Sequence, residues 1–191
     1  HRPDERESPM GIHLGISISR GARMDWIVQK ATELGVTEIS PLLRERTEVK
    51  LQGERAEKKI QHWRQVATSA CEQCGRNRLP GIHPLQRIDV WSAAVQARCK
   101  LVLHHRSSFT LGELETPTEL ALLVGPEGGL SAQEIAAAEA AGLVPLCLGP
   151  RGLRTETADL AAMAAAPPDS ITPTMAASGP TALATSLAPW A

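Results

Sequence analysis

Apolar residues along the chain follow the spacings of five β-strands. In segment 12–19, apolar residues stand at alternate positions, Ile12, Leu14, Ile16 and Ile18, which predicts a strand. Segment 120–125 is continuously apolar, as expected of a strand that is covered on both faces. Further strands are predicted over residues 36–43, 100–105 and 143–149.

Between these strands, apolar residues recur every three or four positions and predict helices. The longest predicted helix covers residues 54–73, where the apolar face is formed by Ile60, Trp63, Ala67 and Ala70. The other helices are predicted over residues 24–34, 91–98, 131–141 and 155–166. Because strands and helices alternate, the chain is expected to be an α/β protein with right-handed crossovers and a mostly parallel sheet with helices on both faces.

Residues at the helix ends support this assignment. Ser131 and Glu134 have the spacing of a capping box, which marks a helix start. Gly35, Gly75 and Gly142 stand where three helices should end, in positions that favour a left-handed backbone. One domain is therefore predicted over residues 12–166.

The composition changes after Ala166. Residues 167–191 contain five prolines and a single charged residue, and they show neither a helical nor a strand period. We interpret this segment as a disordered or poorly packed tail. No stretch approaches the length of a transmembrane helix, and the charged N-terminus is unlike a signal peptide, so a cytoplasmic location is expected.

Cysteine and histidine spacing does not predict a metal site. Cys71 and Cys74 form a C-x-x-C near the end of a predicted helix, but a second closely spaced pair is missing. His104 and His105 are adjacent in a predicted strand, so their side chains point to opposite faces.

Two glycine-rich loops are the strongest signal for a binding site. Residues 125–131 and 148–158 each follow a buried strand and precede a helix. Ligands of open parallel sheets bind beyond the carboxyl ends of the strands, and glycine lets the backbone approach them closely. We therefore expect both loops to line one pocket. Neither loop contains G-x-G-x-x-G or G-K-[ST], which disfavours dinucleotide and P-loop nucleotide sites.

The two loops, LLVGPEGGLS and LGPRGLRTETA, carry a resemblance to a known family. Together with Arg23-Met24-Asp25, the stretch 29–36 and Glu72-Gln73-x-x-Arg76, they resemble the RsmE family of ribosomal RNA methyltransferases, of the SPOUT superfamily. The resemblance covers residues 12–166. It implies methylation of uridine N3 in 16S ribosomal RNA of the small subunit, with S-adenosylmethionine as cofactor.

The family resemblance also implies an architecture. The C-terminal methyltransferase domain of the family is a trefoil knot, with the helix from Thr155 as the threaded element, and it forms a homodimer through the knot region. The N-terminal PUA-like barrel of the family is absent from these residues, so residues 1–11 are interpreted as a residual linker. Gly152 stands where the family has a branched apolar residue, and the last helix breaks at Pro167.

The same resemblance implies a cofactor site made of strand ends and the two loops. Its residues are Leu103, His104, Val124, Gly125, Pro126, Glu127, Gly128, Gly129, Leu148, Gly149, Gly152, Leu153, Arg154, Thr157 and Ala158.

The chemistry of the implied reaction suggests catalytic residues. The weakly acidic uridine N3–H must lose its proton as the methyl group arrives, so a cation that stabilises the developing anion is needed. Arg154 is the first candidate for this role and Arg151 the second. Glu156 is a candidate base, although a glutamate in the first turn of a helix is also ordinary dipole compensation. The target uridine is expected to be flipped out or single-stranded.

Net charge alone does not suggest an RNA partner, because 20 Lys and Arg face 21 Asp and Glu in 191 residues. The charge is unevenly distributed, however. Residues 1–80 hold 14 basic against 11 acidic residues, and residues 81–191 hold 6 against 10. The candidates for RNA contacts are therefore Arg23, Lys30, Arg44, Arg46, Lys58 and Arg76. The alternative is a solvated helix face with interleaved glutamates.

Three other functions remain open at this point. The nearest is a SPOUT ribose 2′-O-methyltransferase, which shares the G-P-E-G loop but ends in a different signature from Arg154-Thr155-Glu156-Thr157. A truncated, non-catalytic remnant that binds cofactor or RNA is the second. A generic phosphate or nucleotide binder is the third, and the lack of G-K-[ST] disfavours it.

Overall fold

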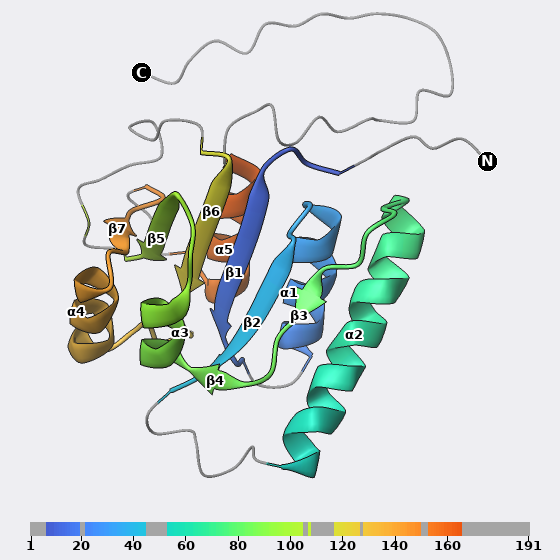
Figure 1. The fold of residues 1–191 in the computed structure, drawn as a ribbon, viewed down its shortest axis with the longest axis horizontal. Coiled ribbons are helices and arrows are strands. Elements are labelled where there is room, and N and C mark those ends of the chain that lie inside the picture. Colours follow the sequence, from blue (N-terminus) through green and yellow to red (C-terminus); the bar gives the residue numbers. More distant parts are fainter. Residues whose placement is uncertain are drawn as a thin grey trace, which may run out of the picture.

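A single parallel sheet forms the centre of the molecule. The computed structural model describes residues 7–19, 22–44, 53–104, 107, 117–126, 128–149 and 153–165. Within them, seven strands pair in the order β3-β2-β1-β6-β5-β7, with β4 also paired to β2, and every pairing is parallel (Figure 1). The strands are β1 (Gly11–Ser17), β2 (Glu38–Leu43), β3 (Gly81–Ile82), β4 (Gln86–Arg87), β5 (Cys99–Leu103), β6 (Glu119–Val124) and β7 (Val144–Leu146).

Helices cover both faces of this sheet. They are α1 (Arg23–Glu33), α2 (Glu54–Cys74), α3 (Ile88–Ala94), α4 (Ala132–Ala140) and α5 (Thr155–Ala165). Helices α1 and α5 pack on one face, whereas α3 and α4 pack on the other, and α2 lies against α1 (Figure 1). The α/β architecture predicted from the alternation of elements is therefore confirmed.

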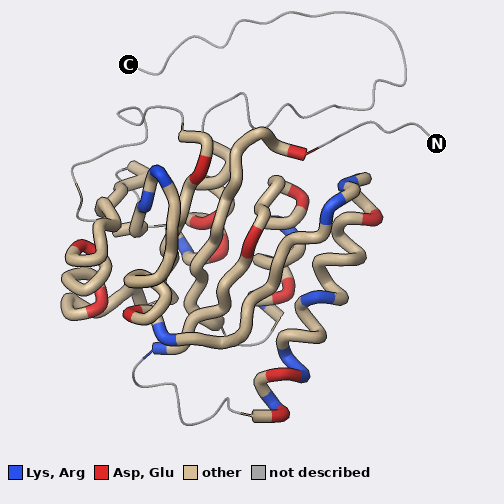
Figure 2. Tube along the Cα trace, viewed as in Figure 1, with Lys and Arg blue, Asp and Glu red and all other residues tan. Residues whose placement is uncertain are grey.

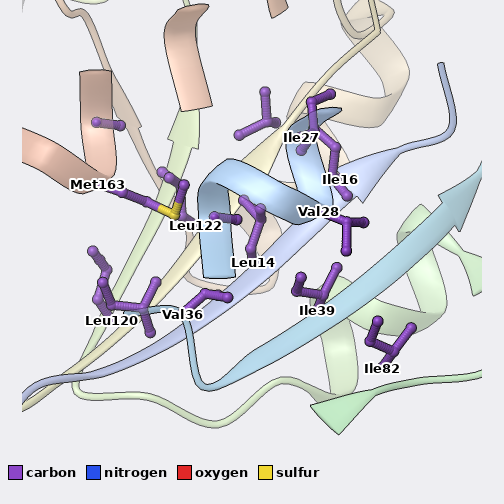
Figure 3. Close-up of a cluster of buried hydrophobic side chains, with 14 of the residues drawn as sticks. Leu14, Ile16, Ile27, Val28, Val36, Ile39, Ile82, Leu120, Leu122 and Met163 are labelled. Carbon is purple, nitrogen blue, oxygen red and sulfur yellow. The ribbon is translucent and has the colours of Figure 1, made fainter. Parts of the chain in front are cut away.

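Strand β1 occupies the middle of the sheet and packs against helices on both faces. Its residues Leu14 and Ile16 are fully buried and pack with Ile27 and Val28 of α1 (Figure 3). On the opposite face, Gly15 lies against the ring of Trp91 from α3. Alternate residues of one strand thus face two different helical layers, as the period of a strand requires.

The predicted elements are all present, with shifted ends. Helix α3 begins at Ile88 rather than at 91, because Ile88 is buried in the cluster under α3 and α4. Strand β7 is shorter than predicted. The two-residue strands β3 and β4 were not predicted, because two residues show no periodicity.

The predicted helix ends are confirmed. The Ser131 hydroxyl accepts a hydrogen bond from the Glu134 backbone N–H, and the Glu134 side chain accepts one from the Ser131 N–H. Gly35, Gly75 and Gly142 have φ angles of 89°, 77° and 87°, so each occupies the left-handed region that ends a helix.

Some expectations lie outside the described residues. The tail 167–191 and most of the linker 1–11 belong to this group, as do residues 150–152, on which the expected knot depends. Among the helices that the structure describes, none has the length and apolar character needed to cross a bilayer.

The contact between Gly15 and Trp91 predicts a strong response to one added methyl group. A Cβ atom at Gly15 would lie 2.7 Å from the Trp91 ring, so Gly15→Ala must displace a buried indole. We expect a loss of about 1–3 kcal/mol in the free energy of unfolding, measured by denaturant titration. Gly11→Ala, in the same strand, is the control, because its Cβ would meet neighbours only at 3.9 Å or more. Equal stability of the two variants would contradict the proposed close packing.

Candidate functional site

A pocket of about 330 Å³ lies at the carboxyl ends of β5, β6 and β7. Both glycine-rich loops and the first turn of α5 contribute to it. Its lining comprises Leu103, His104, Val124, Gly125, Pro126, Gly128, Gly129, Leu130, Leu146, Cys147, Leu148, Gly149, Leu153, Thr155 and Ala158. The volume falls within the range of small-molecule sites. The position agrees with the rule that parallel sheets bind ligands beyond the ends of their strands.

Most residues expected around a cofactor meet in this pocket. Leu103, His104, Val124, Gly125, Pro126, Gly128, Gly129, Leu148, Gly149, Leu153 and Ala158 all line it. Arg154 and Thr157 do not line it. Glu127 and Gly152 lie outside the described residues. Sequence reasoning missed Leu130, Leu146, Cys147 and Thr155, although all four stand inside or beside the two loop motifs.

The first loop, residues 125–131, contains a tight turn. The Gly129 N–H donates to the Pro126 carbonyl at 2.8 Å, and Gly129 has a φ of 71°. At Gly125, an added Cβ would approach the Leu130 side chain to 2.9 Å, so only glycine fits there without a shift. The Ser131 cap then fixes the loop to α4. The backbone of this loop, rather than long side chains, forms one wall of the pocket.

The opposite wall joins the ends of β5 and β7. The His104 N–H donates to the Leu146 carbonyl at 2.9 Å, which extends the pairing of these strands into the loop region. The Cys147 thiol contacts the Gly149 carbonyl at 3.2 Å, and Gly149 has a φ of 134°, a backbone conformation that favours glycine. The backbone conformation of Gly149 therefore sets the direction in which the chain leaves β7.

The start of α5 holds the proposed catalytic arginine at the edge of the pocket. The Arg154 carbonyl accepts hydrogen bonds from the N–H groups of Thr157 and Ala158, at 3.0 and 2.8 Å, while its side chain is exposed. Thr155, next to it, is buried and lines the pocket. Glu156 is half-buried in the first turn, and Arg151 lies outside the described residues. The geometry thus fixes the backbone of Arg154 and leaves its side chain in contact with solvent.

One buried carboxyl group close to the pocket was not anticipated. Asp159 follows Ala158 on α5 and is fully buried; its Oδ1 accepts the Leu160 N–H at 2.8 Å, but its Oδ2 has no partner among the described residues. Burial, with a smaller contribution from Glu156, raises the pKa of Asp159 to about 7. An acidic residue in the middle of an alanine-rich helix was the only sequence signal for this feature.

The described lining of the pocket is mainly apolar and suits ligand binding. Its described side chains are mostly aliphatic or absent, and none is a carboxylate, lysine or arginine. Such a pocket favours a ligand with a flat apolar part whose polar edges meet backbone groups.

Four of the residues proposed for RNA contacts have exposed or partly exposed side chains. Arg23 begins α1 and is exposed. Ion pairs link Lys30 to Glu33 at 2.9 Å, Arg44 to Glu134 at 3.7 Å and Lys58 to Glu54 at 2.6 Å. Along α2, basic and acidic residues are interleaved (Figure 2). Arg46 lies outside the described residues. The described basic side chains are therefore partly neutralised, and their contact with RNA stays a prediction.

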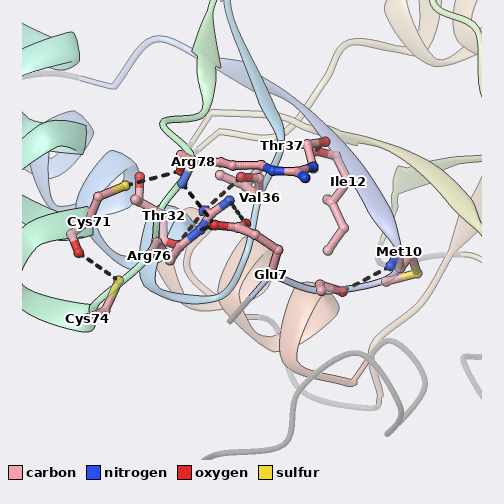
Figure 4. Close-up of polar contacts among 11 residues, drawn as sticks. Glu7, Met10, Ile12, Thr32, Val36, Thr37, Cys71, Cys74, Arg76 and Arg78 are labelled. Atoms are coloured by element: carbon pink, nitrogen blue, oxygen red, sulfur yellow. Dashed lines mark hydrogen bonds and ion pairs between the residues drawn. The ribbon is translucent and has the colours of Figure 1, made fainter. Parts of the chain in front are cut away.

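Arg76 has a different role from the one expected. Its side chain is only 4% exposed, and it pairs with Glu7 at 2.7 Å (Figure 4). The same guanidinium donates to the carbonyls of Thr32 and Val36, at 2.8 and 2.9 Å. Its donors are used inside the protein, so Arg76 joins the end of α1 to the segment after α2, and the expected RNA contact is wrong.

Comparisons with known proteins agree with this fold and pocket. The model of a family described as an RNA methyltransferase domain matches residues 6–167, which defines the class of protein to which this fold and pocket belong. The ribosomal RNA small subunit methyltransferase E of Buchnera aphidicola from Schizaphis graminum is 41% identical over 161 residues, 83% of this chain and 65% of the relative. The corresponding Bacillus subtilis protein is 33% identical and is covered to 67%.

A solved structure shows the same relationship. The ribosomal RNA small subunit methyltransferase E of Neisseria gonorrhoeae, bound to S-adenosyl methionine, is 43% identical, with a TM-score of 0.80 over 86% of this chain and 69% of that one. The chain belongs to the RsmE family of RNA methyltransferases. It spans about two thirds of the length of the curated relatives that it matches.

The buried pair of Arg76 and Glu7 yields a prediction for stability. Burial raises the pKa of Glu7, but the hydrogen bonds and charges of Arg76 and Arg78 outweigh it and leave the pKa below its ordinary value. Glu7→Gln leaves the Arg76 charge buried without a partner, so we expect a loss of about 3 kcal/mol in the free energy of unfolding at neutral pH.

The pH dependence of this loss provides the check. Because the pKa of Glu7 is lower in the folded state than in the unfolded state, its ionised form stabilises the protein at pH values above the ordinary pKa. This stabilisation disappears as the pH falls through the folded-state pKa. Denaturant titrations of wild type and Glu7→Gln should therefore converge under acid conditions. Glu54→Gln, which removes an exposed partner of Lys58, is the matched control and should change little. A loss in Glu7→Gln that is independent of pH would rule out the ion pair as its cause.

Proposed function

We propose that the domain transfers a methyl group from S-adenosylmethionine to N3 of a uridine in 16S ribosomal RNA. The observation that carries this proposal is the pocket. The two loop motifs that identify the family come together around it, and the Neisseria gonorrhoeae relative, 43% identical, is bound to S-adenosyl methionine.

The described lining is compatible with this cofactor. Leu103, Val124 and Leu148 provide apolar surface for the faces of an adenine ring, and the glycines of both loops leave backbone groups accessible to its edges. A cationic sulfonium would meet no lysine or arginine among the described lining residues. When bound, the cofactor supplies the electrophilic methyl group.

Arg154 is proposed to act on the uridine rather than on the cofactor. It does not line the pocket, it is exposed, and its carbonyl is held by two N–H groups of α5. From the rim, its guanidinium can stabilise the charge that develops as N3 loses its proton. Arg151 and Glu156 remain the further candidates, for charge stabilisation and for proton removal.

The proposal includes partners and a location. The small ribosomal subunit is the proposed RNA partner, with Arg23, Lys30, Arg44 and Lys58 as candidate phosphate contacts and a flipped-out uridine as the target. A homodimer through the knot region and a cytoplasmic location follow from the family resemblance. Sedimentation of the purified chain tests the dimer directly.

Mass spectrometry of the product tests the proposed reaction. The chain is incubated with unmethylated small subunits and labelled S-adenosylmethionine, and the RNA is then digested to nucleosides. We expect label on the base of uridine, at N3. Label on a ribose would replace the proposal with a ribose 2′-O-methyltransferase. Cofactor binding without any transfer would instead assign a binding remnant.

Gly125→Ala tests the role of the first loop. The added Cβ would approach the Leu130 side chain and backbone to about 3 Å, so the loop must move. We expect at least tenfold weaker binding of S-adenosylmethionine, measured by calorimetry, because a shift of the loop backbone disturbs the pocket wall. Gly81→Ala is the control. Its added Cβ would make only ordinary contacts, at 3.9 Å or more, so this variant should bind S-adenosylmethionine normally.

Arg154→Ala tests the proposed catalytic role. Loss of the rim cation should lower the rate of methyl transfer about 100-fold, while cofactor affinity changes little, because the side chain does not line the pocket. Calorimetry and a transfer assay on the same preparation separate the two effects. Equal losses of binding and transfer would show that Arg154 only maintains the structure of the loop.

A further inference from the structure

Three side chains with metal-binding atoms meet at the opposite end of the sheet from the pocket. His13 lies near the start of β1, Glu38 begins β2 and His83 follows β3. One ligand atom from each of these side chains lies within 4.8 Å of the other two. Sequence spacing did not indicate this cluster, because its members are 25 and 45 residues apart.

One carboxylate oxygen of Glu38 lies close to both imidazoles. Its Oε2 is 2.7 Å from His83 Nε2 and 3.6 Å from His13 Nδ1. The two rings are stacked, with centroids 5.2 Å apart. Tetrahedral zinc has bonds of about 2.0–2.2 Å to nitrogen and oxygen, so neighbouring ligand atoms are roughly 3.4 Å apart. Glu38 and His83 are 48% and 40% exposed, and small side-chain rotations are enough to reach that spacing.

The backbone beneath these side chains is rigidly paired. His13 stands directly opposite Glu38 in the β1–β2 pairing, and Glu38 stands opposite Gly81 in the β2–β3 pairing. Two of the ligands thus lie on the neighbouring strands β1 and β2, and the third, His83, directly follows β3, all on the α3 side of the sheet. Sites built on paired strands hold their ligands more accurately than sites on loops.

Hydrogen bonds with Ser40 and Trp91 orient the His13 ring. Its Nε2 lies 2.9 Å from the Ser40 hydroxyl and 3.2 Å from the indole N–H of Trp91. The indole can only donate, so in the metal-free protein Nε2 accepts and the proton sits on Nδ1. A metal bound at Nδ1 would displace its proton to solvent, and Nε2 would then take up a proton and donate it to Ser40. The Trp91 hydrogen bond would be given up in that case.

We propose that His13, Glu38 and His83 form a binding site for a divalent transition metal ion, with zinc as the fitting ion. Two imidazoles and one carboxylate are a ligand set that zinc and its neighbours prefer, and the exposed side of Glu38 and His83 leaves room for water in a fourth position. Bound metal would clamp β1, β2 and β3 together at this end of the sheet.

Titration of the metal-free chain with Co²⁺ tests the site. The visible absorption of Co²⁺ reports its coordination, and thiolate ligands add a strong near-ultraviolet band. We expect one equivalent to bind with nitrogen and oxygen ligands only, and Zn²⁺ to displace it. His83→Gln and Glu38→Gln should each weaken binding at least tenfold, since even the loss of a residue that only supports a ligand has an effect of that size. Both side chains are exposed enough for the variants to fold, which circular dichroism verifies.

A second histidine–carboxylate pair provides the matched control. His62 Nε2 lies 2.8 Å from Asp25 Oδ2 on the other side of the sheet, so His62→Gln removes an equally close pair but should leave Co²⁺ binding unchanged. The indole N–H resonance of Trp91 should also shift on metal binding, because its acceptor is lost. No binding, binding through thiolates, or binding that survives His83→Gln would overturn the proposal.

Discussion

Strand β1 must be buried on both faces and paired at both edges, and the rest of the fold is arranged around this requirement. Parallel pairing with β2 and β6 uses its backbone groups, while Leu14 and Ile16 pack under α1. On the other face, Gly15 admits the Trp91 ring at a distance that no side chain could allow. Helix α3 can therefore lie directly on the sheet. Since β6 pairs with β1 and β5 pairs with β6, the sheet also holds the ends of β5 and β6 beside the pocket.

Two buried carboxyl groups give the domain opposite responses to pH. Glu7, paired with Arg76, has a lowered pKa, so its stabilisation is present at neutral pH and is lost on acidification. Burial raises the pKa of Asp159 to about 7, so the folded state binds a proton that the unfolded state has released. Stability from Asp159 therefore falls as the pH rises from its ordinary pKa of 3.8 towards 7. Glu7 thus favours the folded state at neutral pH, whereas Asp159 favours it only below its raised pKa.

The sequence predicted what depends on local pattern and missed what depends on distant contacts. Periodicity located the main strands and helices, and the glycine loops located the pocket, because glycine placement after buried strands is a local signal. Arg76 was misassigned, since its partner Glu7 is 69 residues away and only the folded chain encloses the pair. The same limit applies to His13 and Glu38, which strand register, rather than spacing, places side by side.

The proposed metal site and the proposed cofactor site occupy opposite ends of the same sheet, on different strands. His13 lies opposite Ala121 of β6, whereas Val124, three residues further along β6, lines the pocket. At about 3.3 Å per residue, the two sites are separated by roughly 10 Å or more along the sheet. A metal ion at His13 therefore cannot contact the cofactor or polarise the transferred methyl group. An effect of the metal on the pocket would have to pass through the pairing of β1 with β6, the strand that the first loop follows.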